Sequence, residues 1–320
     1  MPPIVHFNVS QIRVAATCPR ILYFDLDRSR RRRLKYPKIT RIWKEGKDDV
    51  TACGSLFHNA IEAFNSRAAA SPELLALLTR NSEGAAQLEQ ELRQHVYTQY
   101  VNRKGLVKAQ GPQQQAFIQA LTNYIRELSD ILSYALSTNM MPQEIVDQMF
   151  GDRRRRVDVT FDVGQSGEGV HITGQLDYVF YDWRVAKRRI IDYKLTPGNE
   201  PSNDLFQVGV YGLMHHAQHG TQPDVAVFYL HPKRQMLELK WEELYARRHK
   251  IYDLLASMSA WASYDPTTGA GVKPPGEPSY CGHCPWAKVC SQRLGPKNEG
   301  GRLTLWEEKL ANNSDRKSVV

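Results

Sequence analysis

Several common signatures are missing from this chain of 320 residues. No uninterrupted apolar run approaches the roughly 20 residues that a membrane-spanning helix needs, so we expect no membrane partner. The pattern GxxxxGK(S/T) of a phosphate-binding loop is absent, which argues against an intrinsic ATPase motor. Met1–His6 shows neither the basic nor the apolar region of a secretory signal, and we therefore expect the protein in the cytoplasm.

What is present is an ordinary globular composition with an excess of basic charge. Apolar residues make up 42% and charged residues 24% of the chain, and the net charge is +8. Such a charge favours a polyanionic partner. The basic residues gather in Arg28–Lys35, Arg153–Arg156 and Lys187–Arg189, and each of these runs is either a solvated face or a contact to a nucleic-acid backbone.

Hydrophobic periodicity predicts a mixed α/β chain. A short helix or turn is expected over 8–25, followed by a basic extended segment to about Val50, and a disordered tail over 312–320. A β-rich block is expected over about 144–194, a strand over Asp224–His231 and an edge strand over Gln235–Trp241. The expected helices are Gly54–Phe64, one starting at Ser71, 86–104, 112–137, Asn203–His219 and 241–262.

Two acidic motifs stand on what we expect to be neighbouring strands. The first is Gly174-Gln-Leu-Asp177, where apolar and polar residues alternate with the period of a half-buried strand. The second is Ile190-Ile-Asp192-Tyr-Lys194, in which Asp192 and Lys194 leave the strand on the same face. Two carboxylates can hold a hard divalent cation, and an ammonium group beside them can orient water and neutralise phosphate charge. Together the motifs suit metal-dependent phosphodiester hydrolysis.

The five cysteines form a second pattern. Cys281, Cys284 and Cys290 make a compact trio, and Cys18 lies far upstream. Disulfides are disfavoured in a chain without a secretion signal, so the trio favours a metal site. Zinc could take Cys18 or His283 as fourth ligand, whereas an iron–sulfur cluster would take Cys18. The spacing alone leaves both metals open.

Two helical pairs complete the set of candidate residues. His58 and Glu62 are four apart on one expected helix, and Gln207 and Tyr211 are four apart on another. Each pair by itself is also what an ordinary amphipathic helix would contain.

The combination and its order are more specific. The patterns Gly54-x3-His58-x3-Glu62, Gly174-x2-Asp177, Asp192-Tyr-Lys194 and Gln207-x3-Tyr211 together resemble the RecB/AddB-like branch of the PD-(D/E)XK nucleases. Cys18-Pro-Arg with Cys-x2-Cys-x5-Cys looks like its iron–sulfur subgroup, which includes the CRISPR-adaptation nucleases, the AddB nuclease domain and the exonuclease V family. The resemblance covers 8–66 and about 144–292.

The resemblance implies a role for each matching position. His58, Asp177, Asp192 and the Tyr193 carbonyl would bind Mg²⁺ or Mn²⁺. Lys194 would activate the attacking water and stabilise the transition state, and Gln207 and Tyr211 would help hold the substrate strand and the lysine. The cysteines that would ligate a [4Fe-4S] cluster are Cys18, Cys281, Cys284 and Cys290.

We therefore expect one nuclease domain over 1–320, with a restriction-endonuclease-like core and a central mixed sheet flanked by helices. Residues 67–143 would be a helical insertion, and 280–292 with Cys18 an iron–sulfur clasp. The expected function is a metal-dependent DNA nuclease, foremost an exonuclease on single strands or DNA ends, in DNA repair or CRISPR spacer acquisition, with a helicase or CRISPR adaptation proteins as partners. The alternative is a non-catalytic nucleic-acid-binding or adaptor subunit with a structural metal cluster.

Overall fold

The computed structural model describes residues 5–30, 49–80, 85–101, 112–151, 155–163, 168–196, 201–284 and 286–294. Within these ranges the chain is a mixed α/β structure, as predicted, and its mixed sheets are consistent with a restriction-endonuclease-like core. No helix of the described ranges is long and apolar enough to cross a membrane. The expected tail, 312–320, lies outside the described residues.

Seven strands in the described ranges form two mixed sheets rather than one central sheet. The first has the order β1-β3-β2, with β1 parallel and β2 antiparallel to β3. The second has the order β4-β5-β6-β7, in which only β5 and β6 are parallel. The strands are β1 (Val5–Asn8), β2 (Arg156–Val163), β3 (Glu168–Gln175), β4 (Tyr178–Asp182), β5 (Lys187–Lys194), β6 (Asp224–Tyr229) and β7 (Gln235–Leu239). The expected single sheet is split because Leu176 and Asp177 belong to neither strand, so that β3 ends at Gln175 and β4 begins at Tyr178.

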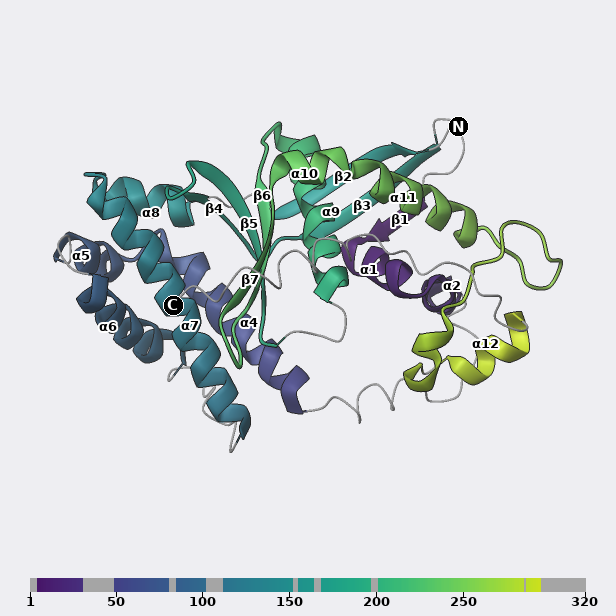
Figure 1. Cartoon of the computed structure of the whole chain (residues 1–320), viewed down its shortest axis with the longest axis horizontal. Helices are drawn as coiled ribbons and strands as arrows, with labels where there is room; N and C mark the ends of the chain where they lie inside the picture. The colour runs from purple at the N-terminus through teal and green to yellow at the C-terminus, as the bar shows by residue number, and fades with distance from the viewer. Residues whose placement is uncertain are drawn as a thin grey trace.

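Helix α9 (Pro201–His219) lies at the centre of the molecule (Figure 1). Every residue from Asp204 to His215 is buried, which explains why its sequence is apolar on most faces. Helix α9 shares one hydrophobic core with both sheets and with α1 (Val9–Thr17), α10 (Trp241–Ala246) and α11 (Arg248–Ala262). The polar residues between Asp204 and His215 therefore face neighbouring elements and not bulk solvent.

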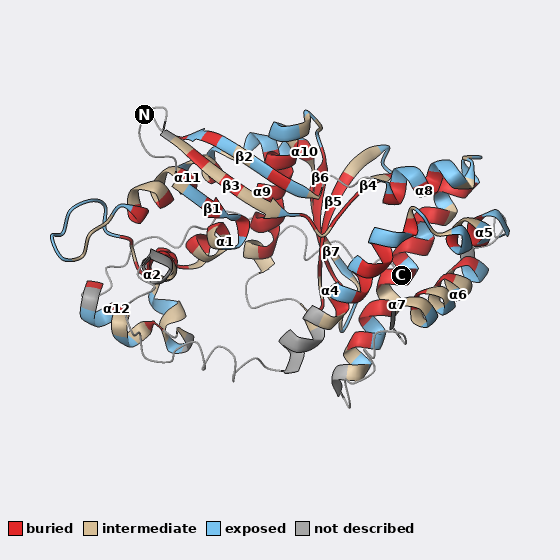
Figure 2. Ribbon diagram, turned by 180° about the vertical axis from the view of Figure 1, so that it is seen from behind, coloured by how far each residue is buried: buried red, intermediate tan, exposed pale blue. Residues whose placement is uncertain are grey.

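A second core lies on the opposite face of the second sheet. Along β5, Ile190 belongs to the α9 core, whereas Ile191 and Tyr193 belong to this second one. Figure 2 shows the resulting buried layers on both sides of β4–β7. The second core is completed by α4 (Asp49–Ala68), α5 (Pro72–Arg80), α6 (Ala85–Val96), α7 (Pro112–Ser137) and α8 (Pro142–Phe150). A turn of π-helix, Tyr97–Val101, follows α6.

A third, small core lies at the other end of the molecule (Figure 1). It joins α2 (Pro19–Arg30) to α12 (Ala287–Leu294), and the 3-10 helix Pro278–His283 precedes α12. The ring of Phe24 stacks on the ring of Trp286 with centroids 5.3 Å apart. Two segments from the two ends of the chain therefore pack together here.

Several element boundaries differ from those predicted. The β-rich block does not begin at 144, because Ile145, Val146 and Met149 form the buried face of helix α8. The expected helix 241–262 is two helices, since Arg247 leaves helical geometry at φ −99° and ψ 5°. The segment after 25 is not extended at first, because α2 continues to Arg30, and 31–48 lies outside the described residues. The expected helix 86–104 gives way to the π-helical turn, while helix 112–137 is confirmed.

Candidate active site

Asp177 and Asp192 are brought together by the pairing of β4 with β5. Tyr178 pairs with Ile191, so the register places the preceding residue, Asp177, opposite Asp192. The side chain of Asp192 is 8% exposed, and its Oδ2 lies 2.8 Å from Nζ of Lys194. We call Asp177, Asp192 and Lys194 the carboxylate centre. The structure thus joins residues that the sequence placed on separate strands.

Protonation in the carboxylate centre is strongly coupled. Burial raises the pKa of Asp177 well above its usual range, and the negative charge of Asp192 and a hydrogen bond with its carboxyl group raise it further. The backbone N–H of Tyr193 donates to Asp177 and acts in the opposite direction. The Oδ2 atoms of both aspartates are buried without an aligned hydrogen bond. Two acids held this close favour a shared cation.

Helix α4 adds His58 and Glu62 to the centre. The Nδ1 atom of His58 lies 3.4 Å from Oδ2 of Asp177, and 35% of the His58 side chain is exposed. Burial lowers the pKa of His58, although the charge of Asp192 partly opposes this. The imidazole is therefore neutral near pH 7, which is the form that binds metals. One turn later, Oε1 of Glu62 lies 3.5 Å from Nε2 of Gln175.

Helix α9 supplies Gln207 and Tyr211 from the other side. Burial, and then the charges of Asp192 and Asp177, raise the pKa of Tyr211 to about 12, while a hydrogen bond with Gln207 lowers it. The ring of Tyr211 packs on Gly174, where an added Cβ would lie 2.6 Å from Cε1 of that ring. The glycine of the first motif is therefore required by the close approach of Tyr211.

Four cysteines line one pocket, which we call the cysteine pocket: Cys18, Cys281, Cys284 and Cys290. Burial raises the pKa of the Cys284 thiol, and the three other cysteines contribute in the same direction. The guanidinium of Arg20, buried at 3% exposure, donates from Nη1 to Sγ of Cys290 over 3.6 Å. The structure thus brings Cys18 to the C-terminal trio. The side chains of Cys53 and His283 lie outside the described residues.

Neither region is a preformed coordination shell. Among the described residues, no group of three or more His, Cys, Asp and Glu side chains has its atoms arranged to hold a metal ion. In the carboxylate centre, the ammonium of Lys194 lies against Asp192 and compensates its charge. Ligand binding at either site would therefore require side-chain rearrangement.

Sequence reasoning missed several contacts around the carboxylate centre. Arg155 donates from Nη1 to the carbonyl oxygen of Asp177 over 3.4 Å. In the sequence, Arg155 is marked only by its place in the basic run Arg153–Arg156. The first two residues of this run lie outside the described ranges. Arg13 pairs with the buried Asp204, and no motif connected them. Of the other basic runs, 31–35 is not described, whereas Arg189 is buried in ion pairs with Asp182 and Glu238.

The model of the PD-(D/E)XK nuclease superfamily matches residues 6–291 of the chain, which includes both regions described above. The chain belongs to this superfamily. A crystal structure of SSO0001 is among the similar solved structures, with 12% identity, coverage of 56% of this chain and 79% of that chain, and a TM-score of 0.29. That likeness is too low to carry an argument. A search of curated proteins gave no match.

Membership of the PD-(D/E)XK nuclease superfamily confirms the coarser part of the resemblance, and it supports a nuclease function. The narrower assignment to the RecB/AddB-like iron–sulfur branch stays a prediction. The same holds for the individual roles assigned to His58, Gln207 and the other site residues.

Proposed function

We propose that this chain is a Mg²⁺- or Mn²⁺-dependent deoxyribonuclease that acts on single-stranded DNA or on DNA ends. The observation that carries the proposal is the carboxylate centre, where two facing carboxyl groups, one of them with a raised pKa, adjoin a lysine. In a subunit that only binds nucleic acid, the repulsion between two facing carboxylates would have no use. In a hydrolase, a divalent cation would relieve this repulsion and then take part in the reaction.

The donor set fits these ions. Asp177, Asp192 and the Tyr193 carbonyl offer oxygen, and His58 offers a neutral imidazole nitrogen. Carboxylate oxygen suits both Mg²⁺ and Mn²⁺, while the imidazole favours Mn²⁺. When bound, the cation would supply Lewis-acid stabilisation of phosphate charge and a lowered pKa for water. The two buried Oδ2 atoms without an aligned hydrogen bond are the natural ligand atoms.

The chain's own residues would then act on the phosphodiester. Lys194, oriented by Asp192 at 2.8 Å, would hold the attacking water in line and stabilise the charge that develops on the phosphate. Gln207 and Tyr211, which are hydrogen-bonded to each other, would hold the substrate strand and limit the movement of the lysine. The neutral phenol of Tyr211 can donate a hydrogen bond to a phosphate oxygen at neutral pH.

We further propose that the cysteine pocket holds a [4Fe-4S] cluster. Four thiols from the two ends of the chain line this pocket, which is the number that such a cluster takes. The buried guanidinium of Arg20 would offset part of its negative charge. A bound cluster would tie α2 to α12 and so close the chain around the nuclease core.

Charge supports binding to a nucleic-acid backbone, and the choice of DNA rests on the resemblance. The net charge of +8 favours binding to a phosphate backbone without sequence readout. The proposed setting is DNA repair or CRISPR spacer acquisition, with a helicase or CRISPR adaptation proteins as partners, and it rests on the resemblance alone.

The test is a cleavage assay on end-labelled single-stranded and double-stranded DNA with Mg²⁺, with Mn²⁺ and with chelator. We expect metal-dependent loss of full-length DNA, fastest on single strands or frayed ends. Anaerobically purified protein should be brown and contain iron and sulfide. Unchanged DNA after long incubation with Mn²⁺ would favour the adaptor function, and a colourless protein with one equivalent of zinc would exclude the cluster alone.

A further inference from the structure

An ion pair beside the carboxylate centre has no part in the roles assigned above. Nη2 of Arg13, in α1, lies 2.8 Å from Oδ1 of Asp204, in α9. The hydroxyl of Tyr229 donates to the other carboxylate oxygen of Asp204 over 3.0 Å. The side chain of Asp204 is 2% exposed, whereas that of Arg13 is 41% exposed. Asp204 and Tyr229 therefore lie in the core, and of these three side chains only that of Arg13 reaches solvent.

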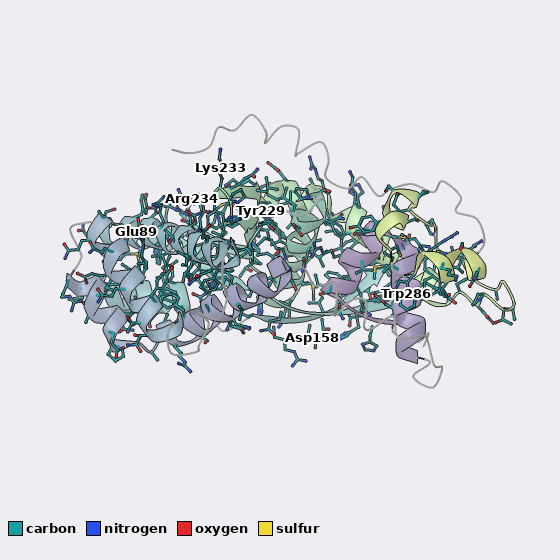
Figure 3. The ribbon with its side chains drawn as sticks, turned by 90° about the horizontal axis from the view of Figure 1, so that it is seen from below. Glu89, Asp158, Tyr229, Lys233, Arg234 and Trp286 are labelled. Carbon is teal, nitrogen blue, oxygen red and sulfur yellow. The ribbon has the colours of Figure 1, made fainter. Side chains whose placement is uncertain are left out.

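The ion pair adjoins the catalytic residues on three elements. Tyr229 is the register partner of Lys194 in the parallel β5–β6 pair, so the two side chains leave the sheet on the same face. Asp204 precedes Gln207 by one turn of α9. Helix α1 begins with Val9, whose side chain and the ring of Tyr211 both close on Gly174. Figure 3 shows Tyr229 in the middle of the molecule, away from Trp286 at the end that carries α12.

Electrostatics link the same groups. Burial raises the pKa of the Tyr229 hydroxyl, Asp204 raises it further and Asp192 adds to this, while the charge of Arg13 lowers it. The pKa of this one hydroxyl therefore depends on the charges of both Asp192 and Arg13.

The chemistry of arginine explains why such a pair would be useful. A guanidinium has N–H donors on more than one edge, so an arginine held by a carboxylate on one edge can bind a phosphate on another. Burying a carboxylate such as Asp204 is costly, and apolar residues could stabilise the interior equally well. A buried acid that orients a half-exposed arginine is the arrangement expected for anion binding.

We propose that Arg13 binds a phosphate of the DNA strand next to the scissile phosphate, and that Asp204 and Tyr229 position its guanidinium. This inference rests on the proposed nuclease function. It makes Arg13 a substrate-binding residue, and Asp204 and Tyr229 positioning residues. The competing explanation is that Arg13 only neutralises the charge of Asp204.

Three variants separate the two explanations: Arg13→Gln, Asp204→Asn and the double variant that combines them. If Arg13 only neutralises Asp204, the double variant removes both charges together and regains wild-type DNA binding. If Arg13 binds phosphate, the double variant stays defective. It also leaves no uncompensated buried charge, so it should fold even where Arg13→Gln alone does not.

Binding is measured with a fluorescent single-stranded oligonucleotide in chelator over a series of salt concentrations. We expect Arg13→Gln and the double variant to bind roughly tenfold more weakly. We also expect the slope of log affinity against log salt to fall by about 0.7, the value for one contact to a single-stranded phosphate. Asp204→Asn, which releases the guanidinium but also removes a negative charge, should show a smaller loss, and Arg13→Lys should recover part of the affinity.

Arg80→Gln is the matched control, because Arg80 is an exposed arginine paired with Glu91 on the helical side of the molecule. It should leave affinity and salt slope unchanged. Wild-type affinity in the double variant, or an equal loss in Arg80→Gln, would overturn the proposal. Cleavage with Mn²⁺ in the same series should show a raised KM with kcat nearly retained for Arg13→Gln. If wild-type protein does not cleave, the nuclease function fails, while the binding series still judges Arg13.

Discussion

The carboxylate centre and the cysteine pocket are built in opposite ways. The carboxylate centre lies between two large cores, and its aspartates are placed by the pairing of two adjacent strands. The cysteine pocket joins the two ends of the described chain and rests on a small core: Tyr23, Phe24, Trp286, Cys290 and Leu294. The first should keep its shape without a ligand, whereas the second should depend on one. At the carboxylate centre the protein scaffold would hold the reactive groups, whereas at the cysteine pocket a bound cofactor would hold the local structure.

The strongest test removes chemistry from the scaffolded region. Asp192→Ala or Lys194→Ala should lower the cleavage rate by at least about 100-fold, because the first removes a proposed metal ligand and the second removes a positive charge that would act on the phosphate in the transition state. The melting temperature of Asp192→Ala should not fall, since Asp192 repels Asp177 in the metal-free protein. End-labelled DNA cleavage and thermal melts measure the two effects. Asp162→Ala, an exposed acid on β2, is the control, and a large loss of stability in Asp192→Ala would break the comparison.

The converse test removes a thiol from the cysteine pocket. Cys290→Ser should lose iron and loosen the packing of α12 on α2, because cofactor binding and local folding are coupled there. Trypsin cleavage at the exposed Lys288 of α12 should become at least about tenfold faster, while the sheet core stays resistant. Cys53→Ser should retain iron. Unchanged iron content in Cys290→Ser would show that this residue is not a cluster ligand.

A smaller effect is expected where the scaffold touches the site. Gly174→Ala would place a Cβ 2.6 Å from the buried Tyr211 ring, which must then move. Such overpacking costs about 1–3 kcal/mol, and the cleavage rate should fall with it because Tyr211 is displaced. Gly54→Ala is the matched control, since an added Cβ there meets nothing within 4 Å and helix α4 gains a better helix former. Equal melting temperatures for the two variants would contradict this packing.

The finest test uses pH. The pKa of Asp177 in the folded, metal-free protein lies above its ordinary value of 3.8, so folding takes up a proton between the two values. The stability from this group is complete below the unfolded pKa and is lost as pH rises through the folded one. Thermal melts in chelator should therefore show a stability loss towards neutral pH that Asp177→Asn reduces. A wild-type pH profile in Asp177→Asn would assign the loss to other groups.

Much of the candidate site could be predicted from local patterns. Alternation in Ile190–Lys194 indicated that Asp192 and Lys194 share a face, and their 2.8 Å contact agrees with it. The spacing of Gln207 and Tyr211 indicated one face of a helix, and the two side chains are hydrogen-bonded. Periodicity was less reliable for boundaries. It predicts a strand where α8 lies, because short apolar runs fit both periods, and it does not indicate the break between β3 and β4.

Local sequence patterns were enough to identify the chemical groups, their faces on single elements and, through the order of the motifs, the nuclease superfamily. The folded structure was needed to show that Asp177 faces Asp192, that Cys18 joins the C-terminal cysteines, and that Arg13 pairs with Asp204. The two kinds of information differ in the distance along the chain over which they act. Backbone geometry repeats every two or 3.6 residues and can be read locally, whereas contacts between distant segments depend on how all the apolar faces pack at once.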